Sequence, residues 1–433
     1  MLTFQENETL ARISPGTSTG EMMRRYWVPA MLDWELPEPD CPPIRLKLLG
    51  EELVAFRDTN GAVGIVDNYC PHRRASLFFG RNEEAGLRCV YHGWKFDVNG
   101  DCVDMPSEPA ESNFKDKVKI KSYPTAEMGN VVWVYMGPPD KQPPLPELEW
   151  TQVPESHRGV NKVVQKCNWL QGLEGGIDTV HINFLHRNLQ GSGIVARDRA
   201  FARSFAARVE VVPTDYGYTY AGIRDQADDN EKYVRAYHFI APWTQLRPNQ
   251  LNRGGAPRLK DSGHMWVPID DYTTMVWNFT FSFGDEPLTE AERLQVGSGN
   301  ELGKDIDFEN GFKSRADASN DYFIDREVQR TQTFTGIPGT NTQDRAVQDT
   351  MGPICDRTRE HLGTTDRAII MARKILLDAS RIVEDGGDPP GLGGNVFDLR
   401  SVEKVLPTDV YWRDALWDEL YHKAQYTPEY VRA

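Results

Sequence analysis

The chain has 433 residues, of which 39% are hydrophobic and 10% aromatic, a composition typical of a globular protein of about two or three domains. Its 49 lysines and arginines are outnumbered by 64 aspartates and glutamates, so the formal charge is -15. This charge disfavours nucleic acid and anionic membranes as partners, because both need a basic surface. The sequence has no apolar run near the ~20 residues of a membrane span, and its start lacks a signal-peptide pattern, so we expect a cytoplasmic protein.

The N-terminal part of the chain, residues 1–40, is expected to be mainly helical and to pack on the larger, C-terminal part. A proline-rich stretch ends it at residues 35–44, and a second proline cluster follows at residues 137–150. Proline clusters interrupt regular structure, so we expect domain boundaries near both positions.

Between these boundaries, residues 41–140 are expected to form a small all-β domain. Apolar and polar residues alternate in short stretches, as in strands with one buried face. The pairs Asn60-Gly61 and Asn99-Gly100 separate such stretches, and Asn-Gly is a strong signal for a hairpin turn.

The remaining residues, 150–433, mix both kinds of element. Residues 170–188 have helical apolar spacing, and residues 364–387 predict a long amphipathic helix with Thr365 as its N-cap and Gly386 beyond its end. Strand patterns recur at residues 207–212, 216–223, 234–241, 263–269 and 273–283. The predicted fold class is therefore α+β: an all-β domain inserted in a domain whose large antiparallel sheet is flanked by helices, as in helix-grip folds.

Two of the six cysteines lie next to histidines. The sequence reads Cys70-x-His72 and then Cys89-x-x-His92, so each short segment offers one thiolate and one imidazole. Structural zinc sites usually take two cysteines from one segment, and a set of unrelated core residues is the other alternative. Two thiolates on one iron and two imidazoles on the other are the ligands of a Rieske [2Fe–2S] cluster, and we interpret the segment as such a site.

A second group of possible metal ligands lies in "GGIDTVHINFLH", which contains Asp178, His181 and His186. On an ideal helix Asp178 lies about 60° from His181, but His186 lies about 140° from His181. The two histidines can therefore share one ion only if a bulge or a helix end lies between them. Two histidines and a carboxylate form the facial triad of non-haem iron oxygenases.

With both motifs, nearly the whole chain resembles the Rieske non-haem iron aromatic ring-hydroxylating oxygenases, especially the phthalate 4,5-dioxygenase branch. The resemblance lies in "YCPHRRASL", "GLRCVYHGWKFDVNG", "MPSEPA", "CNWLQGLEGGIDTVH" and "TMGPICDRTREHLGTTD". It implies two cofactors, a [2Fe–2S] Rieske cluster and one mononuclear Fe(II).

The resemblance also implies roles for individual residues. Asp178 resembles the family's bridging aspartate, which passes electrons from a cluster histidine (His92) of the adjacent identical subunit to the iron. The third iron ligand should be Asp344, with Asp349 and Asp356 as alternatives. The implied ligands are Cys70, His72, Cys89 and His92 for the cluster, and His181, His186 and Asp344 for the iron.

The family implies an aromatic carboxylate as substrate, held by arginines that correspond to Arg235 and Arg208. Arg235 shares a strand face with Tyr237 and Phe239, where a guanidinium needs a partner such as a substrate carboxylate. Arg208 shares a face with Glu210, so a surface ion pair is the competing interpretation.

The implied reaction is hydroxylation of the ring by O2 to a cis-dihydrodiol. The sequence has no dinucleotide-binding fingerprint, so electrons from NAD(P)H must come through a separate flavin and iron–sulfur reductase. The family resemblance also implies a trimer or hexamer of identical chains. The alternatives are an O-demethylating or ether-cleaving monooxygenase of the same branch and, more distantly, a Rieske electron carrier.

Overall fold

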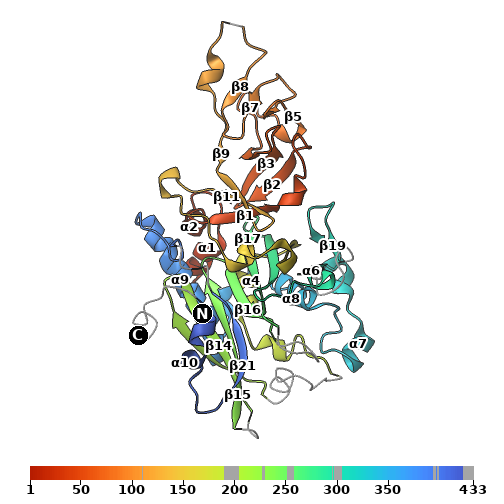
Figure 1. The fold of residues 1–433 in the computed structure, drawn as a ribbon, viewed down its shortest axis with the longest axis vertical. Helices are drawn as coiled ribbons and strands as arrows, with labels where there is room; N and C mark the ends of the chain where they lie inside the picture. Colours follow the sequence, from red (N-terminus) through yellow and green to blue (C-terminus); the bar gives the residue numbers. More distant parts are fainter. Residues whose placement is uncertain are drawn as a thin grey trace. The chain divides into compact units, whose positions relative to one another are not determined.

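The computed structural model describes residues 1–109, 111–189, 204–226, 230–250, 258–294, 296, 305–393, 396 and 399–422. The chain divides into two compact units (Figure 1). Residues Ile13–Leu145 form the first, here called the β domain, and Met1–Arg12 with Pro146–Ala433 form the second, here called the large domain. The β domain is inserted in the large domain, as expected, with divisions after residues 12 and 145, where the sequence suggested a β domain of residues 41–140. Residues 13–40, which were expected to pack on the larger part of the chain, belong to the β domain. No described helix is long and apolar enough to cross a membrane.

The expectation of a mainly helical segment over residues 1–40 is wrong for its second half. Helices α1 (Phe4–Ala11) and α2 (Ser18–Met23) are short, and residues Trp27–Leu32 form strand β1. All six residues of β1 are buried, and the strand pairs antiparallel with β11 (Val131–Tyr135). A run of consecutive apolar residues fits a strand that is buried on both faces as well as it fits a helix, so the pattern was ambiguous.

The described residues of the β domain form three small antiparallel sheets. Their strand orders are β1-β11-β10, β2-β3-β4-β9 and β5-β6-β7-β8. The further strands are β2 (Ile44–Leu48), β3 (Glu51–Arg57), β4 (Val63–Asp67), β5 (Arg81–Glu83), β6 (Gly86–Arg88), β7 (Lys95–Phe96), β8 (Cys102–Asp104), β9 (Ser122–Tyr123) and β10 (Thr125–Met128). Both predicted hairpin turns are confirmed: Gly61, between β3 and β4, has φ +86°, and Gly100, between β7 and β8, has φ +80°.

A ten-stranded sheet, counted over the described residues, forms the centre of the large domain (Figure 1). Its order is β13-β14-β15-β16-β17-β18-β12-β20-β19, with β21 paired to β15, and every pair except β12–β20 is antiparallel. The strands are β12 (Arg158–Gln165), β13 (Arg208–Pro213), β14 (Gly217–Gln226), β15 (Glu231–Ile240), β16 (Thr244–Pro248), β17 (Lys260–Pro268), β18 (Thr274–Ser282), β19 (Ile306–Asp307), β20 (Lys313–Ser314) and β21 (Val402–Pro407). The predicted antiparallel sheet is thus confirmed.

Three helices of the large domain carry or support the candidate site: α4 (Trp169–Ile177), α8 (Thr340–Asp349) and α9 (Arg367–Glu384). Helix α4 packs closely on β17, because a Cβ atom added at Gly176 would lie 2.0 Å from Cη2 of Trp266. The other described α-helices of this domain are α1, α3 (Glu149–Gln152), α6 (Glu290–Leu294), α7 (Arg326–Thr331) and α10 (Trp412–Leu420).

The start of α9 differs from the prediction. The helix begins at Arg367 with Asp366 as its cap residue, so Thr365 is not the N-cap. Thr365 instead lies in a 3-10 turn over Thr364–Asp366. A hydrogen bond from the Gly363 N–H to the Asp366 carboxylate, at 2.6 Å, stabilises this turn. Gly386 follows the helix with φ +83°, as expected for a residue beyond a helix end.

A buried ionic network joins α4 to α9. Glu174 of α4 accepts hydrogen bonds from Arg373 at 2.6 Å and from Arg357 at 3.0 Å, and Arg357 has no exposed surface. Removing one partner of such a network leaves a buried charge unpaired, so the network resists displacement of α4.

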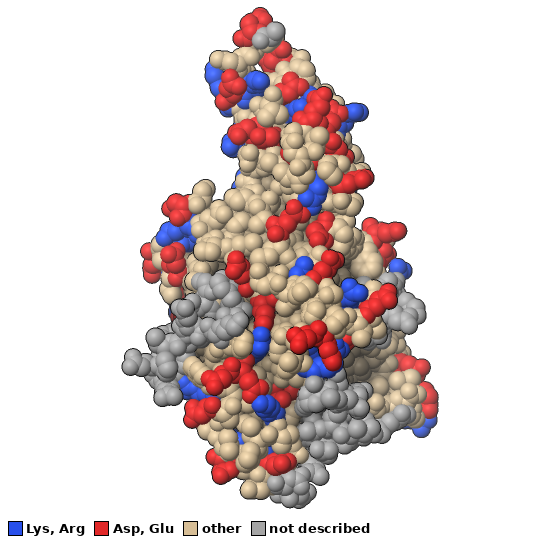
Figure 2. All heavy atoms as spheres, in the orientation of Figure 1, with Lys and Arg blue, Asp and Glu red and all other residues tan. Residues whose placement is uncertain are grey.

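Outside the core, Figure 2 shows acidic side chains spread over the visible face with basic ones between them.

Candidate metal centres and cavity

The two cysteine-histidine loops of the β domain share one backbone design. In the first, Cys70 N–H donates to Ala75 O and Arg74 N–H donates to Cys70 O, both at 2.9 Å. In the second, Cys89 N–H donates to Trp94 O at 2.8 Å and Gly93 N–H donates to Cys89 O at 2.9 Å. The fourth residue after each cysteine has a positive φ, +61° at Arg74 and +78° at Gly93. The loops are therefore structural counterparts, and each presents one cysteine in the same way.

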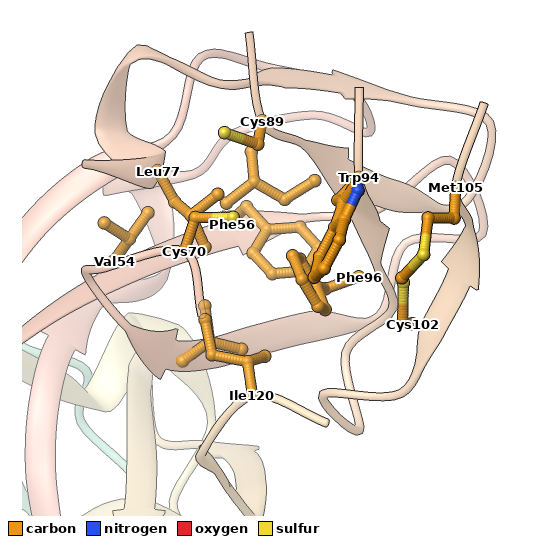
Figure 3. Close-up of a cluster of buried hydrophobic side chains, with 12 residues drawn as sticks. Val54, Phe56, Cys70, Leu77, Cys89, Trp94, Phe96, Cys102, Met105 and Ile120 are labelled. Atoms are coloured by element: carbon orange, nitrogen blue, oxygen red, sulfur yellow. The ribbon is translucent and has the colours of Figure 1, made fainter. Parts of the chain in front are cut away.

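The cysteines of these loops are buried and reduced. Cys70 is 1% exposed and Cys89 is 3% exposed, both are free, and both belong to a hydrophobic cluster that includes Phe56, Leu77 and Phe96 (Figure 3). A hydrogen bond between the two thiols raises the pKa of Cys70 and lowers the pKa of Cys89, so the two side chains titrate as a pair.

The histidines of the two loops lie beside each other. The ring centroids of His72 and His92 are 4.4 Å apart, and His72 stacks on Trp94 with the same centroid separation. Nδ1 of His72 is buried without a hydrogen-bond partner among the described residues. A buried nitrogen of this kind is costly unless it binds something, so the pair of thiols and the pair of imidazoles fit a cluster with a Cys2His2 ligand set.

In the large domain, the end of α4 brings two distant histidines together. The helix stops at Ile177, Asp178 is its C-cap, and His181 begins a 3-10 turn. The N–H of Leu185 then donates to His181 O at 2.8 Å, which turns the chain back so that His186 faces His181. The prediction that residues 170–188 are helical is thus wrong beyond Ile177. Because the helix ends there, His181 and His186 are not held about 140° apart, as they would be on a continuous helix.

Asp344 of α8 completes a group of three possible metal ligands. His181 Nε2 and His186 Nε2 are 3.2 Å apart, and Asp344 Oδ1 lies 3.5 Å from the first and 3.3 Å from the second. Ligand atoms that each lie about 2 Å from one ion have this spacing. Asp344 Oδ1 is also buried without a hydrogen-bond partner among the described residues, so the residues fit a mononuclear iron.

The two other aspartates that the sequence left open lie elsewhere. Asp349 Oδ2 accepts a hydrogen bond from the Tyr322 hydroxyl at 2.9 Å. Asp356 caps a 3-10 turn by accepting from Thr358 N–H at 3.1 Å. The geometry therefore brings Asp344, and neither alternative, to the histidines.

Each histidine of the triad has a different polar neighbour behind it. Nδ1 of His181 lies 3.5 Å from Asp178 Oδ2, and burial would raise the pKa of Asp178, but His181 and the Val180 N–H hold it below its usual value. Nδ1 of His186 lies 2.7 Å from Oε1 of Gln343, whose Nε2 donates to Ile337 O at 2.8 Å. Because that oxygen only accepts, His186 Nδ1 carries the hydrogen and Nε2 keeps a lone pair for a metal.

The three possible ligands line a cavity of about 500 Å³. One wall of the cavity is a face of the large sheet. Every second residue of a strand points to the same face, and residues from five neighbouring strands line the cavity in this way. These wall residues are Val163 and Gln165 of β12, Val276 and Asn278 of β18, Ser262, His264 and Trp266 of β17, Gln245 and Arg247 of β16, and Arg235 and Tyr237 of β15.

Of the two arginines predicted to bind substrate, only Arg235 lines the cavity. Its Nη2 donates to Pro248 O at 3.0 Å, and its buried Nε has no partner among the described residues. Arg208 does not line this cavity: it lies on the edge strand β13, is exposed, and pairs with Glu210 at 3.3 Å, as the competing interpretation of a surface ion pair expects.

Sequence reasoning missed Arg247 and Gln343. Arg247 is half-buried in the cavity wall, and burial and the nearby charge of Arg235 lower its pKa to about 10, so it stays charged at neutral pH. Arg247 lies two residues after Gln245 and so shares its strand face. This could have pointed to Arg247, but the strand itself was not predicted from the sequence. The signal for Gln343 was its place next to Asp344.

Comparison with known proteins identifies the family. Residues 26–124 match the model of the Rieske [2Fe-2S] domain, and residues 134–429 match the model described as LigXa C-terminal domain like. The chain is 40% identical to the phthalate 4,5-dioxygenase oxygenase subunit of Pseudomonas putida, over 96% of this chain and 94% of the relative. The chain belongs to the Rieske non-haem iron oxygenases.

Other relatives place this oxygenase among enzymes of varied substrates. It is 40% identical to the 3-chlorobenzoate-3,4-dioxygenase oxygenase subunit of Comamonas testosteroni, over 96% of this chain and 98% of the relative. It is 32% identical to the 5,5'-dehydrodivanillate O-demethylase oxygenase subunit of Sphingobium sp., over 96% of this chain and 89% of the relative.

Solved structures show the same fold at low identity. The NdmA QL mutant of Pseudomonas putida CBB5 with theobromine has a TM-score of 0.61 at 17% identity, covering 91% of this chain and 99% of its own. Dicamba monooxygenase bound to dicamba has a TM-score of 0.58 at 17% identity, covering 84% and 98%. The predicted fold class is confirmed, as are the predicted cofactors, since the family combines a Rieske cluster with a mononuclear iron.

Proposed function

We propose that this oxygenase hydroxylates an aromatic carboxylate to a cis-dihydrodiol, with O2 as oxidant and electrons from a reductase. The observation that carries the proposal is the convergence of His181, His186 and Asp344 in a cavity that also holds Arg235 and Arg247. The iron would supply O2 activation, and the Rieske cluster would supply its electrons.

The contacts support the following residue assignments. Cys70, His72, Cys89 and His92 hold the cluster in the β domain, and the histidine pair with Asp344 holds the iron. Gln343 keeps His186 in the tautomer that a metal needs.

Asp178 is the proposed route for electrons between subunits. It is held as a carboxylate, it lies 3.5 Å from the iron-side His181, and it is partly exposed, at 23% of its side chain. These properties suit a residue that accepts a hydrogen bond from His92 of an adjacent identical chain. The assembly we propose, as the family resemblance implies, is a trimer or a hexamer of identical chains, in the cytoplasm where NAD(P)H is present.

The two cavity arginines support an anionic substrate. Both remain protonated at neutral pH, and a guanidinium in a half-buried wall is best satisfied by a carboxylate. The overall charge of -15 repels anions, so local positive charge is needed to bind one. Two relatives carry phthalate and chlorobenzoate in their names, which supports the same substrate class.

The electron donor is proposed to be a separate flavin and iron–sulfur reductase that oxidises NAD(P)H. A carrier role without oxygenation would leave the triad and its cavity unused. The relative named an O-demethylase supports one competing reaction, oxidation of a methoxy carbon or an aryl ether on the same class of acid.

Product analysis under labelled O2 tests the proposal. The holoenzyme with a flavin reductase and NADH is incubated with phthalate, 3-chlorobenzoate, a methoxybenzoate and a phenoxybenzoate. We expect a dihydrodiol with both oxygen atoms from O2. If only the methoxybenzoate reacts, and gives formaldehyde and a phenol, the reaction is O-demethylation and the proposal of ring hydroxylation is wrong. Consumption of none of the acids would contradict the proposed substrate class.

A further inference from the structure

A row of polar side chains crosses the cavity wall without a role in the proposed chemistry. Gln245 of β16 pairs directly with His264 of β17, and His264 pairs directly with Asn278 of β18. Directly paired residues of antiparallel strands point to the same face, and all three line the cavity. All three are also buried, at 1%, 6% and 2% exposed.

The hydrogen bonds of Asn278 determine which nitrogen of His264 carries the hydrogen. Asn278 Nδ2 donates to Val276 O at 3.4 Å, and Asn278 Oδ1 accepts from Asn341 Nδ2 at 3.3 Å. The atom that lies 2.6 Å from His264 Nδ1 is therefore the amide oxygen, which only accepts. Nδ1 must be the donor.

The imidazole of His264 is neutral, so its second nitrogen is an acceptor. Burial and the neighbouring charge of Arg247 lower the pKa of His264 to about 3. With its hydrogen on Nδ1, the ring presents a lone pair at Nε2. Among the described residues, the only hydrogen bond of the His264 side chain is the one between Nδ1 and Asn278.

Gln245 adds a second acceptor beside the first. Its Nε2 donates to Gly176 O at 2.6 Å and to the Tyr220 hydroxyl. A backbone carbonyl only accepts, so the amide nitrogen is fixed there and Oε1 lies on the other side. Oε1 is buried without a partner among the described residues. A buried acceptor without a donor is costly, so this row fits a ligand that supplies a donor.

We propose that Gln245 Oε1 and His264 Nε2 form an acceptor subsite for a ring hydroxyl, so that the substrate is a hydroxy-substituted aromatic carboxylate. The inference rests on the proposed function, which supplies the carboxylate subsite. Arg247 follows Gln245 by two residues on the same strand face, about 7 Å away along the strand. A carboxylate on the arginine side and a hydroxyl on the acceptor side of one benzene ring match this arrangement.

Binding of matched acids to the resting holoenzyme, without reductase, tests the inference. Isothermal titration calorimetry is run with benzoate, with 2-, 3- and 4-hydroxybenzoate, and with the corresponding methoxybenzoates. At least one hydroxybenzoate should bind about tenfold tighter than benzoate. Its methyl ether, which cannot donate, should lose that advantage.

Variants assign the preference to the subsite. In His264→Phe, the preferred hydroxybenzoate and benzoate should bind with nearly equal affinity (a ratio close to one), while the affinity for benzoate changes by less than about threefold. His238→Phe is the matched control, because His238 is a fully buried histidine of β15 that bonds Tyr216 outside the cavity wall, and it should keep the wild-type ratio. The comparison of acids on the wild-type protein decides the question even if a variant fails to fold.

Two outcomes separate this inference from the proposed function. Equal affinity of the wild type for benzoate and all three hydroxybenzoates would overturn the acceptor subsite alone, as would an unchanged preference in folded His264→Phe. Failure of every acid to bind would overturn the proposed substrate class and the subsite with it.

Discussion

The two metal centres are assembled over different distances along the chain. The cluster residues lie between positions 70 and 92, in two loops with matched backbone hydrogen bonds. In the large domain, Asp344 follows His186 by 158 positions, and the triad forms only because α8 reaches the end of α4. A site made by local loops can be read from spacing, whereas a site made by tertiary packing needs the fold or a relative.

The largest effect should come from breaking the long-range member of the triad. Asp344→Ala removes one of the three iron ligands. We therefore expect loss of the mononuclear iron and a fall in turnover of more than about 100-fold, with the Rieske absorption spectrum unchanged. Asp349→Asn is the control, because Asp349 lies on the same helix but bonds Tyr322. Iron loss in the control, with iron retained in Asp344→Ala, would reassign the ligand.

The neighbour of that ligand should have the next largest effect. Gln343→Leu removes the acceptor that orients His186, and such supporting residues typically contribute 10- to 100-fold to metal affinity. Iron affinity is measured by competition with a chelator. Gln348→Leu, a buried glutamine of the same helix that bonds Gln165 and Gln171, should keep wild-type iron affinity. Equal iron affinity in both variants would leave Gln343 without a positioning role.

The cavity arginine gives a smaller effect, on substrate binding. Arg247→Met should raise KM for an aromatic carboxylate about tenfold to thirtyfold and change kcat less, because a charge-assisted hydrogen bond is lost. Arg208→Met should leave both constants unchanged, since Arg208 is exposed on an edge strand. Steady-state kinetics with a flavin reductase measures both. The opposite pattern would restore Arg208 as the substrate ligand.

The smallest effect concerns the two counterpart loops themselves. Gly93→Ala places a Cβ 2.7 Å from Pro106 Cγ at a φ of +78°, so we expect about 1–2 kcal/mol of destabilisation. Arg74→Gly at the equivalent position relieves a positive φ. It loses exposed contacts, namely an ion pair with Asp67, a hydrogen bond to Tyr69 O at 3.3 Å and the packing of the guanidinium over the Tyr69 ring, so it should be close to neutral. The temperature at which the visible absorption of the cluster is lost measures the stability of each variant. Equal temperatures for Gly93→Ala and Arg74→Gly would contradict the expected difference between the two loops.

The sequence predicted much of this molecule because its signals were local. Cysteine-histidine spacing, two Asn-Gly turns and strand alternation all act within a few residues, and the structure follows them. The ambiguity among Asp344, Asp349 and Asp356 could not be removed by spacing, because α8 meets α4 through tertiary packing. Arg247 was missed because β16 is a five-residue strand, too short to show a clear alternation. Alternation also does not tell an edge strand from a cavity wall, so it could not show that Arg208 lies outside the cavity.

The most direct test of the account is the amount of iron and acid-labile sulfide per chain in anaerobically purified wild type and His181→Ala. The account predicts about three irons and about two sulfides in the wild type, because the cluster holds two irons and the triad holds one. In His181→Ala we expect about two irons, about two sulfides and an intact Rieske spectrum. Two irons in both proteins would contradict the account, since His181, His186 and Asp344 would then hold no metal and the chain would act as an electron carrier.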